Sequence, residues 1–188
     1  MGCWGITAFE SDAGLDAVEF VRGILPKNGK VELAAILSAI QADDWNGPES
    51  PGEGVSHTSP MALAEIIVAF LEGNVNDLDY DEAWAAQDNK FAAITSFTAD
   101  SASIAWLRDY LSQTLAGALD NATHAIDAPS RWGGWFEERN WHGWQKHMKM
   151  LIDRLNTLGS QQAGPVGLVR PREPEVAPII EPELGGIE

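Results

Sequence analysis

Apolar residues recur at intervals of three and four positions in several stretches of the chain, and each such stretch predicts an amphipathic helix. The first lies in residues 12–25, where the Ser11 hydroxyl can cap the helix and Pro26 ends it. A second stretch follows in residues 31–43. The turn Lys27-Asn28-Gly29 separates these two predicted helices.

The middle of the chain predicts three further helices. Residues 46–59 are rich in Gly, Pro and Ser, which is typical of a loop. Ser59-Pro60 then provides a capping hydroxyl and a proline suited to the first turn of a helix that ends at Gly73. Residues 82–94 predict a shorter helix, and residues 100–118 predict a long one with a continuous apolar stripe.

Four of the eight tryptophans lie in the segment RWGGWFEERNWHGW, residues 131–144. Such a cluster can bind a ligand or belong to the core. Trp141 and Trp144 are in line with the apolar stripe of a helix predicted over residues 140–159, so we interpret them as core residues. The other two tryptophans flank a Gly-Gly turn and can fold back over the first turns of that helix.

No stretch alternates between apolar and polar residues over a length that is convincing for a strand. The predicted fold is therefore all-α, with an irregular N-terminal segment and five or six helices in one domain over residues 1–159. Residues 160–188 contain five prolines and little periodicity, which is typical of an extended, disordered tail.

The charge is unevenly distributed. The chain carries 28 acidic and 12 basic residues, a formal net charge of −16. No Lys or Arg occurs between Lys30 and Lys90, whereas this interval holds twelve acids. These are Glu32, Asp43, Asp44, Glu49, Glu53, Glu65, Glu72, Asp77, Asp79, Asp81, Glu82 and Asp88. Such a surface attracts basic partners, and it also keeps a small protein soluble.

A field of this sign repels phosphate backbones and anionic lipid, so we predict no nucleic-acid partner and no membrane partner. No apolar run reaches the roughly 18 residues of a membrane span, and the N-terminus lacks the pattern of a signal peptide. Cys3, the single cysteine, cannot form an internal disulfide, which suits a reducing compartment. We therefore expect a cytoplasmic protein.

The patterns for metal binding and catalysis are weak. His142 and His147 are five positions apart and miss the four-residue spacing at which two helical imidazoles share a zinc ion. Residues 77–88 resemble a calcium loop in part, but Glu82 stands where the loop requires Gly and Asp88 where it requires Glu. No nucleophile elbow, phosphate loop or dinucleotide fingerprint occurs. We predict no metal and no cofactor.

The N-terminal sequence GCWGITAFESDAGLD resembles a bacterial family catalogued as domain of unknown function 4259. The matching elements are Trp4-Gly5, Phe9-Glu10, Ser11-Asp12 and Leu15-Asp16, whereas Ile6-Thr7-Ala8 replaces the small, glycine-containing run usual in that family. The resemblance covers about the first twenty residues and implies a bacterial cytoplasmic protein. It assigns no catalytic residues, because the activity of that family is not established. Many small acidic bacterial proteins of this kind are encoded beside toxin genes as immunity proteins.

Our first hypothesis is a non-enzymatic acidic binding protein, such as an immunity protein that neutralises a basic toxin domain. Charge and loop position select seven candidate contacts for the partner: Asp43, Asp44, Glu72, Asp77, Asp79, Asp81 and Glu82. The alternative is a small enzyme or ligand-binding protein with a pocket beside residues 132–144, where His142 or Glu138 is the candidate acid or base. Self-association through an apolar helix face is a third possibility.

Overall fold

The computed structural model describes residues 2–51, 58–79, 89–124, 138–160 and 164–171. This part of the chain is mostly helical. Its α-helices are α1 (Asp12–Ile24), α2 (Leu33–Ala42), α3 (Thr58–Glu72), α4 (Ser101–His124) and α5 (Trp141–Ser160). Its strands are β1 (Lys30–Glu32), β2 (Ser96–Ala99) and β3 (Val166–Val169). Three 3-10 turns accompany them: η1 (Ala8–Glu10), η3 (Val75–Leu78) and η5 (Glu138–Asn140).

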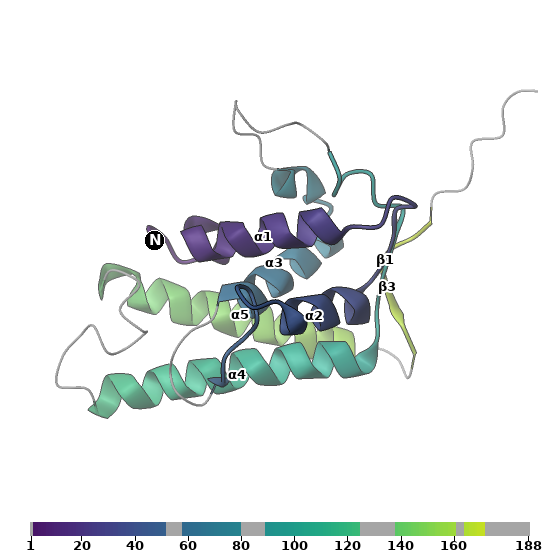
Figure 1. Cartoon of the computed structure of the whole chain (residues 1–188). Helices are drawn as coiled ribbons and strands as arrows, with labels where there is room; N and C mark the ends of the chain where they lie inside the picture. Colours follow the sequence, from purple (N-terminus) through teal and green to yellow (C-terminus); the bar gives the residue numbers. More distant parts are fainter. Residues whose placement is uncertain (1, 52–57, 80–88, 125–137, 161–163, 172–188) are drawn as a thin grey trace, which may run out of the picture.

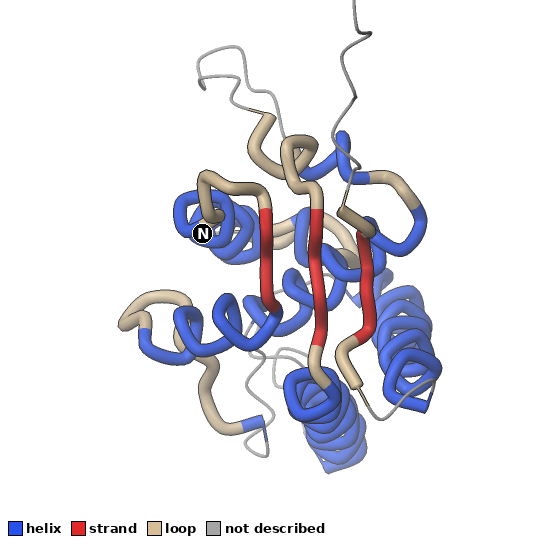
Figure 2. The backbone as a smooth tube through the Cα atoms, turned by 90° about the vertical axis from the view of Figure 1, so that its right-hand side faces the viewer, coloured by secondary structure: helices blue, strands red, loops and turns tan. Residues whose placement is uncertain are grey.

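Helix α3 is the centre of the fold. Eleven of its residues are buried, and it contacts α1, α4 and α5 (Figure 1). Helices α4 and α5 pack along one another below it, and α1 lies above it. The three strands stand at one end of this helical body, with the helices on one side of the sheet (Figure 2). None of the helices described combines the length and the apolar character that crossing a bilayer requires.

The predicted helix starts and ends are confirmed at several residues. The Ser11 hydroxyl accepts the Gly14 N–H at 3.0 Å, which caps α1. Asp100 accepts the Ser103 N–H at 2.8 Å at the start of α4. Gly73 has a φ of 78°, the left-handed conformation that ends a helix most easily at glycine. Helix α2 begins at Leu33 and is therefore shorter than predicted.

The interpretation of Trp141 and Trp144 as core residues is confirmed. They are 8% and 1% exposed, and their rings stack with centroids 5.5 Å apart. The buried stripe of α5 continues through Met148 to Leu158, as its spacing predicts. Trp132 and Trp135 lie outside the described residues.

The helical class is confirmed in its main part, and a small sheet that was not predicted is added to it. Strand β1 pairs with β2 in parallel, and β3 pairs with β2 in the antiparallel direction. Val31, Phe97 and Ala99 are buried between exposed or half-buried neighbours, so the alternation that defines a strand is present. It spans only three or four residues in each strand, which is too short to distinguish it from the end of a helical pattern.

The predicted tail over residues 160–188 is wrong at its beginning. Ser160 still belongs to α5, and residues 166–169 form β3 at the sheet's second edge. Leu168 is 7% exposed and joins the main core. The many prolines of this region predicted disorder. The one short apolar run, Val166 to Val169, was too brief to predict a strand against that composition. The prediction for residues 172–188 lies outside the described residues.

If Leu168 anchors β3, Leu168→Ala will lower the free energy of unfolding by about 2–3 kcal/mol, because the truncation leaves a cavity in the core. Urea denaturation followed by circular dichroism measures this. Gly167→Ala is the matched control, since a Cβ at Gly167 would have no atom within 4 Å. Equal stability of Leu168→Ala and the original chain would contradict the placement of β3.

Candidate functional site

The N-terminal segment forms a closed loop that leads into α1. The Trp4 N–H donates to the Glu10 carbonyl at 2.9 Å, and the Asp12 N–H donates to the Gly2 carbonyl at 3.0 Å. The Gly2 N–H in turn donates to the Asp12 carboxylate at 2.6 Å. The predicted irregular N-terminal segment is therefore present as a hydrogen-bonded loop whose ends are tied together.

The Glu10 side chain fills this loop. It accepts the backbone N–H groups of Ile6 at 2.9 Å and Thr7 at 3.0 Å, and the Thr7 hydroxyl at 3.1 Å. The hydrogen bonds from the Thr7 and Ile6 backbone lower the pKa of the Glu10 carboxyl below its usual value. A Cβ on Gly5 would collide with the Glu10 carboxylate, so a larger residue there would displace this carboxylate from its hydrogen bonds.

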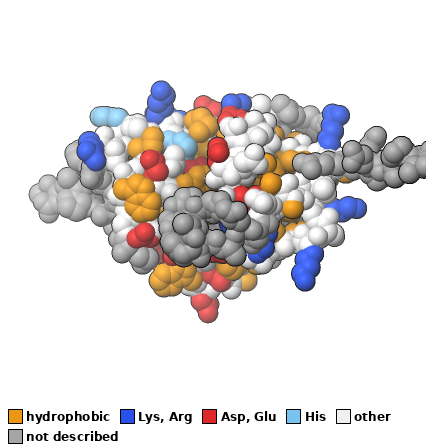
Figure 3. All heavy atoms as spheres, turned by 90° about the horizontal axis from the view of Figure 1, so that it is seen from above, with side chains coloured by type: hydrophobic (Ala, Val, Ile, Leu, Met, Phe, Trp, Pro, Cys, Tyr) orange, Lys and Arg blue, Asp and Glu red, His pale blue; other side chains and the backbone are white. Residues whose placement is uncertain are grey.

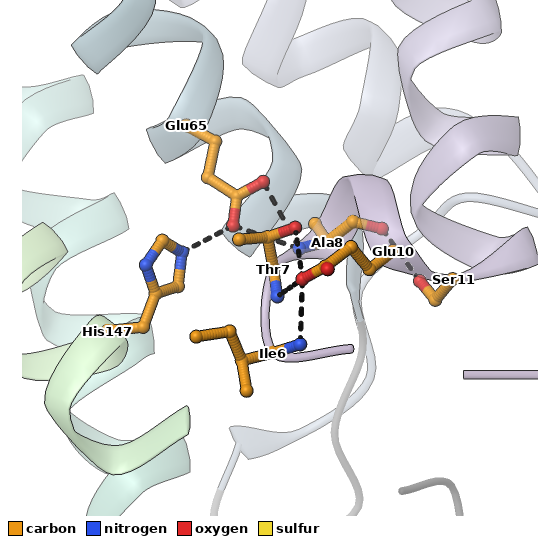
Figure 4. Close-up of polar contacts among 7 residues, drawn as sticks. All are labelled: Ile6, Thr7, Ala8, Glu10, Ser11, Glu65 and His147. Carbon is orange, nitrogen blue, oxygen red and sulfur yellow. Dashed lines mark hydrogen bonds and ion pairs between the residues drawn. The ribbon is translucent and has the colours of Figure 1, made fainter. Parts of the chain in front are cut away.

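A second carboxylate, that of Glu65 in α3, connects the loop to the helices (Figure 4). Its two oxygens lie 2.9 Å and 3.1 Å from the backbone nitrogen of Ala8, which donates to them. Its Oε1 atom lies 2.6 Å from Nε2 of His147 in α5. Residues that are 57 and 82 positions from Glu65 in sequence thus bind the same carboxylate. We call Glu65, His147, Ala8 and Glu10 the polar latch.

A histidine paired with a carboxylate is also the arrangement of a general base, so the latch invites a catalytic interpretation. Both side chains are largely withdrawn from solvent, since Glu65 is 6% exposed and His147 is 13% exposed. Three cavities found among the described residues, beside β1, beside Tyr110 and between α4 and α5, are lined by other residues. The latch therefore suits a structural task, holding the N-terminal loop on α3 and α5.

Of the two residues named for the enzyme alternative, the structure describes the side chain of His142 but not that of Glu138. His142 is exposed at the start of α5, on a different side of the helix from His147. Burial raises the pKa of the Cys3 thiol, which makes it a poorer nucleophile. Residues 132–137 and the Glu138 side chain lie outside what is described, so the predicted pocket there stays a prediction.

The seven predicted partner contacts fall into three groups. Asp43 and Asp79 bind the backbone of their own loops. Asp43 accepts the N–H groups of Trp45 at 3.0 Å and Asn46 at 2.6 Å, and Asp79 accepts those of Phe91 at 3.0 Å and Ala92 at 2.8 Å. These two carboxylates stabilise turns and have little capacity left for a partner.

Three of the other predicted contacts are more accessible. Glu72 forms an exposed ion pair with Arg154 at 2.9 Å. Asp44 and Asp77 are exposed, and within the described part of the chain no hydrogen bond or ion pair of their side chains is found. Asp81 and Glu82 lie outside the described residues. Asp79 belongs to the partial calcium pattern, but its oxygens are used by the backbone as described above.

Helix α1 adds acidic residues that the sequence reasoning missed. Asp16 and Glu19 are exposed on it, and the Trp45 indole N–H donates to the Asp16 carboxylate at 3.3 Å. At the far end of α1, the buried Arg22 guanidinium donates to the Leu78 carbonyl at 2.8 Å. Helix α1 therefore lies between the segment containing Asp44 and the segment containing Asp77. The signal available in the sequence was the spacing of Asp12, Asp16 and Glu19, which places them on one helix face.

Trp45 is the most exposed of the large hydrophobic residues found on the surface, at 63%. We define the acidic face as Asp16, Glu19, Asp44 and Asp77 together with Trp45. In the view from above, acidic side chains lie among exposed hydrophobic ones, and most Lys and Arg side chains stand near the margins (Figure 3). Exposed tryptophan beside charge is typical of binding surfaces, where aromatic anchors contribute much of the affinity.

A scan against protein-family models gave no match to this chain, and searches of curated proteins and of solved structures gave none either. The resemblance of residues 2–16 to the family named above thus remains a prediction.

Glu65→Gln tests the polar latch. We expect it to lower the free energy of unfolding by about 1–3 kcal/mol, because an amide is a weaker acceptor than a carboxylate for the buried Ala8 N–H and offers His147 a weaker hydrogen bond. Chemical denaturation measures the difference. Glu72→Gln removes an exposed ion pair instead and should cost less than about 1 kcal/mol. Equal effects of the two variants would show that the latch contributes nothing beyond a surface pair.

Glu10 adds a pH dependence. Because the folded protein lowers the pKa of Glu10, its contribution to stability is present above the carboxyl pKa of the unfolded chain. That contribution is lost as the pH falls through the lower, folded value. We expect Glu10→Gln to flatten the loss of stability below about pH 4.3, the usual glutamate pKa, in melting experiments across pH. If stability falls with decreasing pH just as steeply in the variant as in the original chain, this role of Glu10 is contradicted.

Proposed function

We propose that this chain is a non-enzymatic acidic binding protein that neutralises a basic partner, such as a toxin domain, in the manner of an immunity protein. The supporting observation is the acidic face. The interval between Lys30 and Lys90 holds twelve acids and no base, and two of its exposed carboxylates flank an acidic α1. A cytoplasmic location accompanies this proposal.

The basic residue of α1, Arg22, offsets the charge of Glu19 within this face. Arg22 of α1 has a side chain that is 7% exposed, and its guanidinium is occupied by Glu19 at 3.4 Å and by the Leu78 carbonyl. Lys27 and Lys30 lie beyond the end of α1, in the turn and the strand that follow. The carboxylates of Asp16, Asp44 and Asp77 therefore act together on an approaching cation.

Trp45 gives this surface an anchor for the partner. Its indole is held from one side by Asp16, and its backbone N–H by Asp43. A fixed aromatic ring loses little entropy on binding, and its face attracts the guanidinium or ammonium group of a basic side chain. The acids would raise the rate of encounter, and Trp45 would slow dissociation.

The kinetic test uses the basic protein that the full chain captures in stoichiometric amount from its native cells. We expect the triple variant Asp16→Lys, Asp44→Lys, Asp77→Lys to bind this protein at least tenfold more slowly at low salt, roughly the lower end of electrostatic rate enhancement. Its salt dependence should be weaker as well. Stopped-flow fluorescence of the tryptophans across ionic strength measures both.

The matched control is Asp109→Lys, Asp120→Lys, Asp153→Lys, which changes the net charge equally on exposed positions of α4 and α5. It should keep most of the association rate. Trp45→Ala should leave the rate nearly unchanged and accelerate dissociation. Equal slowing by both triple variants would show that only net charge matters, and no slowing in either would remove the proposal.

A further inference from the structure

Strand β1 is an open edge of the sheet. The strand order is β1-β2-β3, so β1 has a single neighbour among the described residues (Figure 2). The Gly29 carbonyl accepts N–H groups of Thr95 at 2.9 Å and Ser96 at 3.1 Å, and therefore faces β2. Because the backbone of a strand alternates in direction, Lys30 and Glu32 direct their backbone groups away from β2.

Two of these outward groups suit an incoming strand. The Lys30 N–H donates to the Asn28 side chain at 3.0 Å, which leaves the Lys30 carbonyl as the acceptor. The Glu32 N–H is the outward donor, while its carbonyl precedes the first turn of α2. In an antiparallel pair, the Lys30 carbonyl would accept the N–H of the peptide residue directly opposite Lys30. The Glu32 N–H would donate to the carbonyl of the peptide residue directly opposite Glu32.

An apolar groove runs along this edge. Its volume is about 510 Å³. Its lining comes from the end of α1 and the turn after it, from β1 and from α2. The apolar lining consists of Ile24, Pro26, Val31, Ala35, Ile36 and Ala39. Unpaired backbone beside a side-chain pocket is the combination by which proteins bind extended peptides through strand addition.

The side chains of β1 define which peptide fits. Lys30 and Glu32 are exposed, and Val31 between them is buried. Opposite charges directly across a strand pair stabilise it, and like charges destabilise it. An antiparallel peptide therefore needs a base opposite Glu32, an apolar residue opposite Val31 that enters the groove, and an acid opposite Lys30.

We infer that the β1 edge and its groove bind an extended segment of a partner protein with the order base–apolar–acid, by antiparallel strand addition. Short, charged edge strands usually discourage pairing. Here the charges of Lys30 and Glu32 favour a segment with the order base–apolar–acid and disfavour one with the order acid–apolar–base. This surface is independent of the acidic face, because none of the residues that define that face lines the groove.

A second copy of this chain has the order base–apolar–acid in its own Lys30-Val31-Glu32. Its helices, however, would clash if its β1 paired with this edge. Helices α1 and α2 extend beyond β1 on the side of the open edge (Figure 2). A second domain would bring its own two helices into that space. A peptide strand brings none, so the occupant we assign is a segment of another protein.

Two fluorescein-labelled synthetic peptides test this, Ser-Thr-Lys-Leu-Glu-Thr-Ser and its charge-reversed counterpart Ser-Thr-Glu-Leu-Lys-Thr-Ser. Fluorescence anisotropy with the full chain should show saturable binding of the first and roughly tenfold weaker binding of the second, as expected for two ion pairs replaced by like-charge pairs. The double variant Lys30→Glu, Glu32→Lys should reverse this preference.

Backbone and groove are tested separately. Methylation of the glutamate nitrogen in the first peptide should abolish binding, since that N–H would donate to the Lys30 carbonyl. Methylation of the leucine nitrogen, which points away from β1, is the matched control and should retain binding. Ala35→Trp fills the groove from an exposed helix position and should weaken binding at least tenfold, with an unchanged circular dichroism spectrum.

Three results would overturn the inference. The first is the absence of saturable binding by either peptide. The second is binding that ignores the order of charges or the position of the methyl group. The third is a concentration-dependent dimer in sedimentation that the single variant Glu32→Lys dissociates, because a second copy would then occupy the edge.

Discussion

The buried carboxylate of Glu65 is the interaction on which the arrangement of this fold depends. Burying a charge in an apolar core costs several kcal/mol unless hydrogen bonds and an opposite charge compensate for it. Here the Ala8 N–H and the His147 ring bind the carboxylate from two distant parts of the chain. Since neither partner is near in sequence, the latch forms only when the N-terminal loop, α3 and α5 are all in place.

The position of α1, and of the acidic face on it, follows from this latch. Ala8 offers its N–H to Glu65 and its carbonyl to the Ser11 hydroxyl, at 2.8 Å, and Ser11 in turn caps α1. A Cβ on Gly14 would collide with the Ala8 carbonyl, so the first turn of α1 lies directly against the latched loop. The direction in which Asp16 projects is thus determined by a contact among buried groups.

The helices and their caps were predictable because each depends on neighbours within one or two turns. Ser11, Gly73 and the stripe from Trp141 to Leu158 are cases in which the local pattern was sufficient. The strands were not, since three residues such as Lys30-Val31-Glu32 become a strand only through β2, more than sixty positions away. The Glu65–His147 pair escaped prediction for the same reason. A glutamate within the apolar run ALAEIIVAF was its one visible sign.

The structure also decides which acidic side chains are available to bind a partner. The net charge of a segment does not show which of its acids are available. Asp43 and Asp79 looked equivalent to Asp44 and Asp77 in the sequence, yet the first two carry the backbone of their turns. Reversing their charge would alter the loops together with the field, so a loss of binding would have two causes. Asp44 and Asp77, which are exposed and make no such bonds among the described residues, are the ones at which charge can be separated from folding.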